Sequence, residues 1–110
     1  MSNDKQAEFA KIIQRIVALD EGWMSEDAKT SEAARGALVD IGKEMAAWAS
    51  RHGVALIKHS VESAGDPQVR RRCALVTTTI KNGKIYMCYL EAREGRHCYY
   101  SCAPATFTPA

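Results

Sequence analysis

Residues 76–89 decide the fold of this chain, and they read VTTTIKNGKIYMCY. β-branched and aromatic residues fill the arms on both sides of the centre, which favours two strands. Asn82-Gly83, between the arms, is the strongest short signal for a two-residue hairpin turn, because both turn residues must adopt positive φ. This turn places Lys81 opposite Lys84, and the positions of all other facing residues follow from that pair.

The hairpin register divides the side chains into two faces, because successive residues of a strand point to opposite sides. One face carries Val76, Thr78 and Ile80 opposite Tyr89, Met87 and Ile85. The other carries Cys73, Leu75, Thr77 and Thr79 opposite Ala92, Leu90, Cys88 and Tyr86. The first face is the better core candidate, since it pairs aliphatic and aromatic side chains across the strands. Neither face is plainly polar, so we expect partial cover on both, with a second subunit as one source of it.

The same two-residue rhythm extends outward from the hairpin in both directions. It predicts strands over 54–62, 72–81, 84–92 and 96–103, with turns at 64–67 and at Glu94-Gly95. The tail 104–110 contains two prolines, and we expect it to fray or to lie along a sheet edge.

Before Gly53 the apolar residues recur every three or four positions, which indicates helices. The first helix is predicted over 4–20, with one apolar stripe: Phe9, Ile12, Ile13, Ile16 and Val17. The second is predicted over 31–51, with a start as early as Ser25 left open, and its seam is Ala34, Leu38, Ile41, Met45 and Trp48. Predicted helix ends are N-caps at Asn3 or Asp4 and at Thr30 or Ser31, and stops at Gly22 and Gly53.

The segregation of helices from strands predicts an α+β fold in one domain, 1–110. A helical hairpin (4–51) packs on a four-stranded antiparallel β-meander (54–103). Hydrophobic residues make up 46% of the chain and charged residues 25%, as in ordinary globular domains. No apolar run is long enough for a membrane span and the start lacks a signal-peptide pattern, so we expect a cytoplasmic protein in a reducing compartment.

The four cysteines, Cys73, Cys88, Cys98 and Cys102, lack the short knuckle spacing of a zinc site. In the predicted register Cys73 and Cys88 lie roughly 13 Å apart along the strands, and so do Cys98 and Cys102. These distances are too long for shared zinc coordination or for a disulfide within either pair. We therefore expect four free, mostly buried thiols and no metal or other cofactor.

A catalytic thiol is an alternative, because His97 adjoins Cys98 and His59 lies in another predicted strand. Neighbours in a strand point to opposite faces, so His97 cannot activate Cys98 directly. No nucleotide-binding, serine-nucleophile or paired-histidine metal motif is present. We expect no catalytic residues, and a cysteine-dependent enzyme or redox protein is kept as the lesser alternative.

Candidate binding residues fall into a basic, an aromatic and a tryptophan group. Residues 1–51 carry seven Lys and Arg against nine Asp and Glu, whereas residues 52–110 carry eight against four. Arg70, Arg71 and Arg72 with tyrosines such as Tyr86 and Tyr99 suit either nucleic acid or an acidic protein surface. The Trp23–Met24 pair suits a protein hot spot, although folding back over the helices is the simpler alternative.

Together these features predict a non-catalytic interaction protein that occupies the surface of a protein partner. Small domains of this kind often act as inhibitors or adaptors, including anti-defence proteins of phages and mobile elements. The alternative is a nucleic-acid-binding module that uses the basic sheet half, and a homodimer is a further open alternative.

Overall fold

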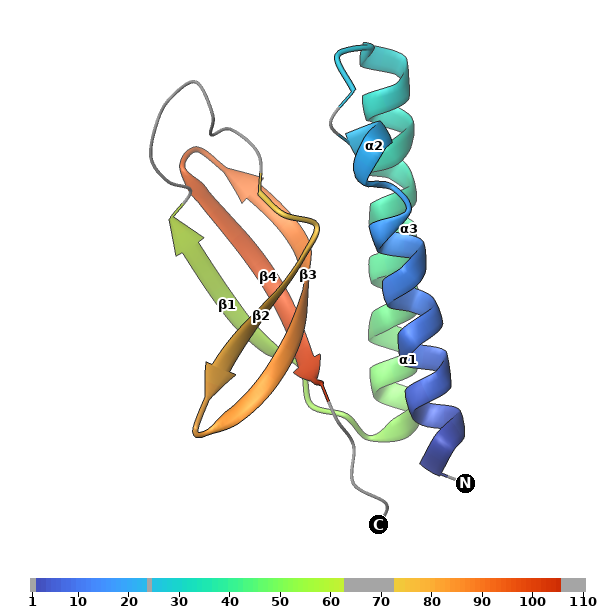
Figure 1. Ribbon diagram of the computed structural model, residues 1–110, viewed down its shortest axis with the longest axis vertical. Coiled ribbons are helices and arrows are strands. Elements are labelled where there is room, and N and C mark those ends of the chain that lie inside the picture. The colour runs from blue at the N-terminus through green and yellow to red at the C-terminus, as the bar shows by residue number, and fades with distance from the viewer. Residues whose placement is uncertain (1, 24, 63–72, 106–110) are drawn as a thin grey trace.

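The computed structural model describes residues 2–23, 25–62 and 73–105, and Figure 1 shows their arrangement. The helices are α1 (Ser2–Val17), α2 (Asp20–Trp23) and α3 (Ala28–His52). The strands are β1 (Ile57–Glu62), β2 (Val76–Lys81), β3 (Lys84–Glu94) and β4 (His97–Pro104). The predicted α+β arrangement, with helices first and an antiparallel sheet second, is confirmed. Within the described residues, no helix has the length and apolar character that crossing a bilayer requires.

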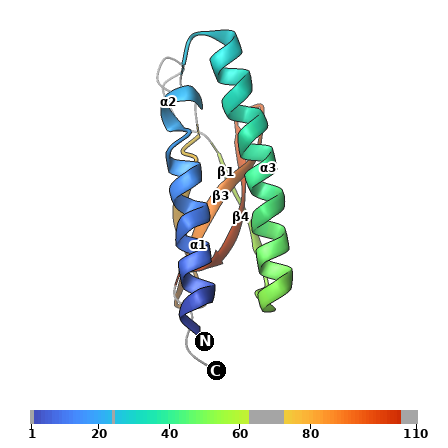
Figure 2. The same ribbon diagram turned by 90° about the vertical axis from the view of Figure 1, so that its right-hand side faces the viewer.

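The long helices α1 and α3 pack side by side in front of the sheet, as Figure 2 shows. Every residue of the predicted α3 seam is buried, and so are Phe9, Ile12 and Ile16 of the α1 stripe. Trp48 is fully buried between the helices, where its ring lies 4.9 Å from that of Phe9 and its Nε1 donates to the Lys5 carbonyl oxygen at 3.1 Å. Val17, at the end of the stripe, is instead 54% exposed.

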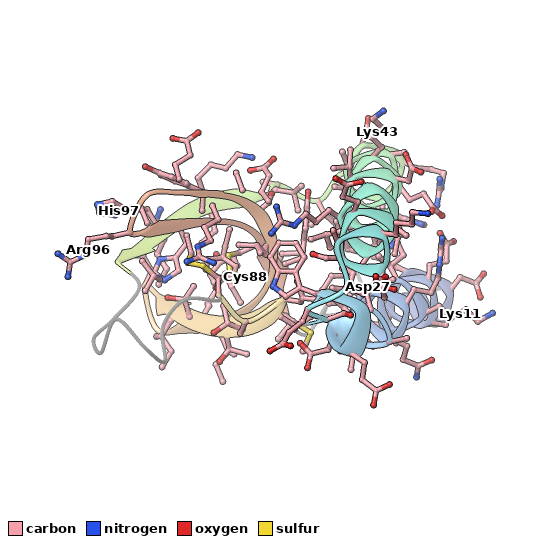
Figure 3. The ribbon with its side chains drawn as sticks, turned by 90° about the horizontal axis from the view of Figure 1, so that it is seen from above. Lys11, Asp27, Lys43, Cys88, Arg96 and His97 are labelled. Atoms are coloured by element: carbon pink, nitrogen blue, oxygen red, sulfur yellow. A yellow bond between two sulfur atoms is a disulfide. The ribbon has the colours of Figure 1, made fainter. Side chains whose placement is uncertain are left out.

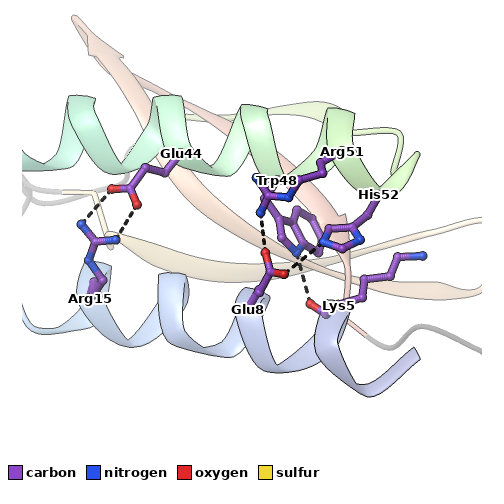
Figure 4. Close-up of polar contacts among 7 residues, drawn as sticks. All are labelled: Lys5, Glu8, Arg15, Glu44, Trp48, Arg51 and His52. Carbon is purple, nitrogen blue, oxygen red and sulfur yellow. Dashed lines mark hydrogen bonds and ion pairs between the residues drawn. The ribbon is translucent and has the colours of Figure 1, made fainter. Parts of the chain in front are cut away.

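Ion pairs border this apolar contact on its solvent side, as Figure 4 shows. Arg15 makes a two-pronged contact with Glu44, at 2.7 and 2.8 Å, and Arg51 pairs with Glu8. The hydrogen bond from Arg51 lowers the pKa of the Glu8 carboxyl. Exposed pairs of this kind add little stability.

The helix ends differ from the predicted caps in three places. Asp27, not Thr30 or Ser31, caps α3: its carboxylate accepts bonds from the Thr30 N–H at 2.9 Å and the Thr30 hydroxyl at 2.6 Å. Asn3 and Asp4 lie inside α1, which begins at Ser2. Gly22 lies within α2 and has no positive φ, so it does not stop the first helix. The predicted stop at Gly53 is confirmed, with φ 65° and its N–H bonded to the last turn.

The predicted hairpin register is confirmed at every pair of β2 and β3, from Val76 opposite Tyr89 to Lys81 opposite Lys84. Asn82 and Gly83 both have positive φ, as the turn requires. The strand order is β1-β4-β3-β2, so β2, β3 and β4 form the expected meander but β1 joins the sheet beside β4 rather than beside β2. Turn chemistry fixes only neighbouring strands, and the long connection after β1 left its partner undetermined.

Both faces of the sheet carry buried residues, as expected. Tyr89 faces the helices, since its ring packs on Gly42 of α3. By alternation Cys88 and Leu90 face the other way, and Figure 3 shows Cys88 inside the curl of the sheet. The preference for the face of Val76 and Tyr89 as the core was wrong, because most of the buried residues lie on the other face: Cys73, Leu75, Cys88 and Leu90. On the preferred face Ile80 is 72% and Ile85 57% exposed, since the hairpin end lies apart from the helices in Figure 1.

The expectation of four free thiols is wrong: Cys73 is bonded to Cys98, and Cys88 to Cys102. The sequence argued against bonds within the pairs Cys73–Cys88 and Cys98–Cys102, and the observed bonds join other partners. Cys88 and Cys102 are directly opposite in the β3–β4 register, which the sequence did not determine. The curl of the sheet then brings Cys73, ahead of β2, within 6.1 Å of Cys98 in β4, measured between Cα atoms. The expected burial is confirmed, since all four residues are at most 5% exposed.

Reduction is expected to destabilise the fold. The crosslinked residues are 25 and 14 positions apart, and closing loops of that size stabilises a protein by about 3 kcal/mol each. Urea unfolding followed by tryptophan fluorescence, with and without a reductant, measures the difference. A Cys73→Ser, Cys98→Ser double variant should lose about half of it. An unfolding midpoint that reductant leaves unchanged would contradict the pairing.

Candidate functional site

One hollow of the described residues lies between α3 and β3, and we call it the α3–β3 groove. Its volume is about 530 Å³, within the range of ligand and peptide sites. The lining residues come from α2, α3 and β3: Trp23, Arg35, Leu38, Val39, Gly42, Lys43, Ala46, Tyr89, Leu90, Glu91, Ala92 and Arg93.

One stripe of α3 forms the helical wall of the groove. Its lining residues recur at three- and four-residue steps from Arg35 to Ala46, so they lie along one side of the helix for about 16 Å. Gly42 lies at the middle of this stripe. A Cβ there would lie 3.3 Å from Cε2 of Tyr89, so the missing side chain lets the tyrosine ring approach the helix. The sheet therefore touches α3 at Gly42, and this contact is part of the groove lining.

The floor of the groove is apolar and its helical rim carries an exposed valine. The side chains of Leu38 and Tyr89 are buried, at 6% and 5% exposure. Val39, one residue beyond the buried seam, is 57% exposed. An exposed aliphatic side chain next to a buried apolar floor extends the apolar surface outward, as binding surfaces do.

Cationic side chains surround the apolar floor. The guanidinium of Arg35 lies 5.2 Å from the ring centre of Trp23, a cation–π contact that holds both at one end of the groove. Lys43 and Arg93 are exposed on the helical and the sheet side, and Figure 3 shows Lys43 on α3. The rim therefore favours carboxylates or other anions next to an apolar group.

A β-bulge shapes the sheet side of the groove. Leu90 faces Tyr100 and Ala92 faces Tyr99, so Glu91 is the extra residue of β3 in this pairing. Bulges re-aim side chains and increase local twist. The Glu91 carboxylate reaches across the sheet to Lys58 of β1, at 2.6 Å, and this exposed ion pair occupies the acidic group that the groove would otherwise present.

A second hollow, of about 590 Å³, continues from the groove over β4 and β1 and shares Glu91 and Ala92 with it. Lys58, His59, Ser60, Glu94, Tyr99 and Tyr100 complete its lining. The rings of His97 and Tyr99 lie 6.2 Å apart, and those of His59 and Tyr100 lie 6.4 Å apart. Apart from Ala92, polar and aromatic side chains therefore line this hollow, rather than aliphatic ones.

The predicted binding residues do not form a single site. Trp23 lines the α3–β3 groove, is half-buried and packs against the core. Tyr99, 37% exposed, lines the second hollow, and the half-buried Tyr86 lines neither hollow. Met24, Arg70, Arg71 and Arg72 lie outside the described residues.

Sequence analysis missed the groove residues Arg35, Val39 and Lys43. They recur at four-residue steps and form a line beside the buried seam of the second helix. Val39 is an apolar residue that follows the seam residue Leu38 and does not belong to the seam. An apolar residue in that position could have indicated an exposed apolar surface. Which element faces that line depends on the tertiary packing.

In this structure each cysteine is bonded to another. The ring of His59 lies beside that of Tyr100. Across residues 2–23, 25–62 and 73–105, no three His, Cys, Asp or Glu side chains are grouped so that they could hold a metal ion.

No family model matches the chain, and no curated protein or solved structure is significantly similar to it. The function is therefore inferred from the geometry of the groove.

Two tyrosines are expected to titrate late. Burial raises the pKa of Tyr89, in the groove floor, and of Tyr100, whose hydroxyl donates to the Ala74 carbonyl oxygen at 3.0 Å. The folded state favours the neutral phenols, and this contribution to the free energy of unfolding is complete below the ordinary tyrosine pKa of about 10. It is lost as pH rises through the higher pKa of the folded state. Tyr89→Phe should remove one late step from the tyrosinate absorbance titration. If that step is unchanged in the variant, the assignment to Tyr89 is wrong.

Proposed function

We propose that this protein is a non-catalytic interaction protein that binds a protein partner through the α3–β3 groove and acts by occupying the partner's surface. The observation that carries the proposal is the exposed Val39 above a buried apolar floor, within a rim of Arg35, Lys43 and Arg93. Apolar anchors surrounded by charged groups are the usual composition of a protein-binding centre.

The shape of the groove supports a partner segment rather than a compact small molecule. Its helical wall extends about 16 Å along three turns of α3. A partner helix or loop of similar length could place an apolar side chain over Leu38 and Tyr89. Its carboxylates would then meet the cations of the rim, which would increase the association rate and select the partner.

The chemistry of the lining supports binding rather than catalysis. Burial keeps the Tyr89 phenol neutral, with its pKa raised, and Glu91 is paired with Lys58. A general base or a nucleophile needs a group poised to lose a proton near neutral pH. The remaining lining consists of Trp23, aliphatic residues and glycine, and cations, which suits the role of an inhibitor or adaptor.

A charge placed at Val39 should abolish partner capture. Val39→Asp puts a carboxylate over the apolar floor, whereas Val17→Asp changes an equally exposed valine of α1 outside the groove, 54% against 57% exposed. Quantitative affinity capture from the native host with the wild type and both variants identifies the partner. Purified partner and titration calorimetry then measure affinity. We expect Val39→Asp to weaken binding at least tenfold, about 1.4 kcal/mol, and Val17→Asp to change it little.

Two outcomes would contradict the proposal. In the first, the captured protein binds Val39→Asp as tightly as it binds the wild type, so the groove is not the binding surface. In the second, no protein is captured but an arbitrary oligonucleotide binds at low salt and dissociates steeply as salt increases. That result would support the nucleic-acid alternative.

The sequence led us to expect a cytoplasmic protein, and the redox state of the four cysteines tests that expectation. Two buried disulfides weigh against it, because cytosolic glutathione and thioredoxin keep protein thiols reduced. Trapping the thiols by alkylation in intact host cells decides the question. Four alkylated cysteines would support the cytoplasm, and none would support an oxidising compartment.

A further inference from the structure

The outer edge of β2 presents backbone groups that no described strand pairs with, since β2 is bonded only to β3. The N–H of Leu90 donates to the carbonyl oxygen of Leu75 at 2.8 Å, so these two form a hydrogen-bonded pair. Such pairs alternate along an antiparallel ladder. Thr77 and Thr79 therefore point their backbone groups toward β3, and those of Val76, Thr78 and Ile80 point outward.

This edge lacks the devices that keep strand edges apart. Natural edge strands carry charges, prolines or bulges that block pairing with another chain. β2 reads VTTTIK, with no proline and no charge before its last residue, and Ile80 is 72% exposed. The opposite edge strand, β1, reads IKHSVE and carries Lys58 with its ion pair to Glu91. The two edges of one sheet thus differ in their protection.

We propose that two copies of this chain pair antiparallel along β2, about a two-fold axis at Thr78, and so join two four-stranded sheets into one of eight strands. Thr78 would face the second copy's Thr78, and Val76 would face the second copy's Ile80. By symmetry Ile80 would face the second copy's Val76, which makes three pairs. Each pair consists of outward-pointing residues, so each exchanges two N–H···O bonds. This interface is independent of the partner-binding groove.

The symmetry of the strand identifies a second copy as the occupant rather than a foreign strand. The outward-pointing residues 76, 78 and 80 are centred on Thr78, so the same edge complements itself when rotated. Val76 and Ile80 lie on one face, and their pairing covers the exposed isoleucine with an aliphatic side chain. The two Lys81 side chains lie at opposite ends of the paired strands, roughly 20 Å apart, where their repulsion is small.

A lysine at the two-fold axis tests the pairing. Thr78 is exposed, so Thr78→Lys should leave the monomer folded, but in the dimer it places two positive charges directly opposite. Ser60→Lys puts the same residue at an exposed position of the other edge strand and serves as the matched control. Size-exclusion chromatography with light scattering, over a range of micromolar concentrations, reports the mass, and circular dichroism checks the fold.

We expect dimers for the wild type and Ser60→Lys, and for Thr78→Lys a dimer dissociation constant raised at least tenfold. A wild type that stays monomeric throughout the range overturns the proposal. A Thr78→Lys protein that remains a dimer overturns it too, since the contact then lies elsewhere. Loss of the dimer in Ser60→Lys as well would also place the contact elsewhere.

Hydrogen exchange followed by NMR gives a second readout that does not depend on a variant. The amides of Val76, Thr78 and Ile80 should exchange more slowly as wild-type concentration rises. Those of Thr77 and Thr79, already bonded to β3, should change little. Protection that does not alternate along β2 would overturn the register.

Discussion

The contact between Tyr89 and Gly42 sets the relation between the two layers of this protein. Tyr89 lies on the face of β3 that meets the helices, and its ring approaches α3 where the helix has no side chain. Because any Cβ at position 42 would meet the ring at 3.3 Å, the spacing of sheet and helix depends on this glycine. Gly42 and Tyr89 both line the groove, so this contact lies within it.

The curl of the sheet has its own causes, separate from the helices. A bulge at Glu91 increases the twist of β3, and the Cys73–Cys98 bond ties the start of the β2 segment to β4 across the intervening strand. Tyr100 crosses the same space to reach Ala74. The concave side therefore forms a small core around the cysteines, while the convex side carries Tyr89 to the helices. One sheet thus contributes to packing on both of its faces.

The surfaces left by this packing suit different partners. The groove combines apolar side chains with cations, and this combination is the basis of the proposal that it binds an anionic, apolar segment. The β2 edge presents backbone groups and short uncharged side chains, which suit another strand. These surfaces lie on different elements, so binding a partner and self-association are compatible in one molecule.

The local patterns of the chain determined its helices and its hairpin. The apolar rhythm before Gly53 and the turn at Asn82-Gly83 act between near neighbours, so the α3 seam and the β2–β3 register were predictable residue by residue. Only the tertiary structure decided that β1 lies beside β4, that Cys88 faces Cys102, and that Arg35, Val39 and Lys43 face a groove. These features depend on contacts between residues distant in the sequence, and no local propensity specifies them because the twist and bulge of the sheet set those distances.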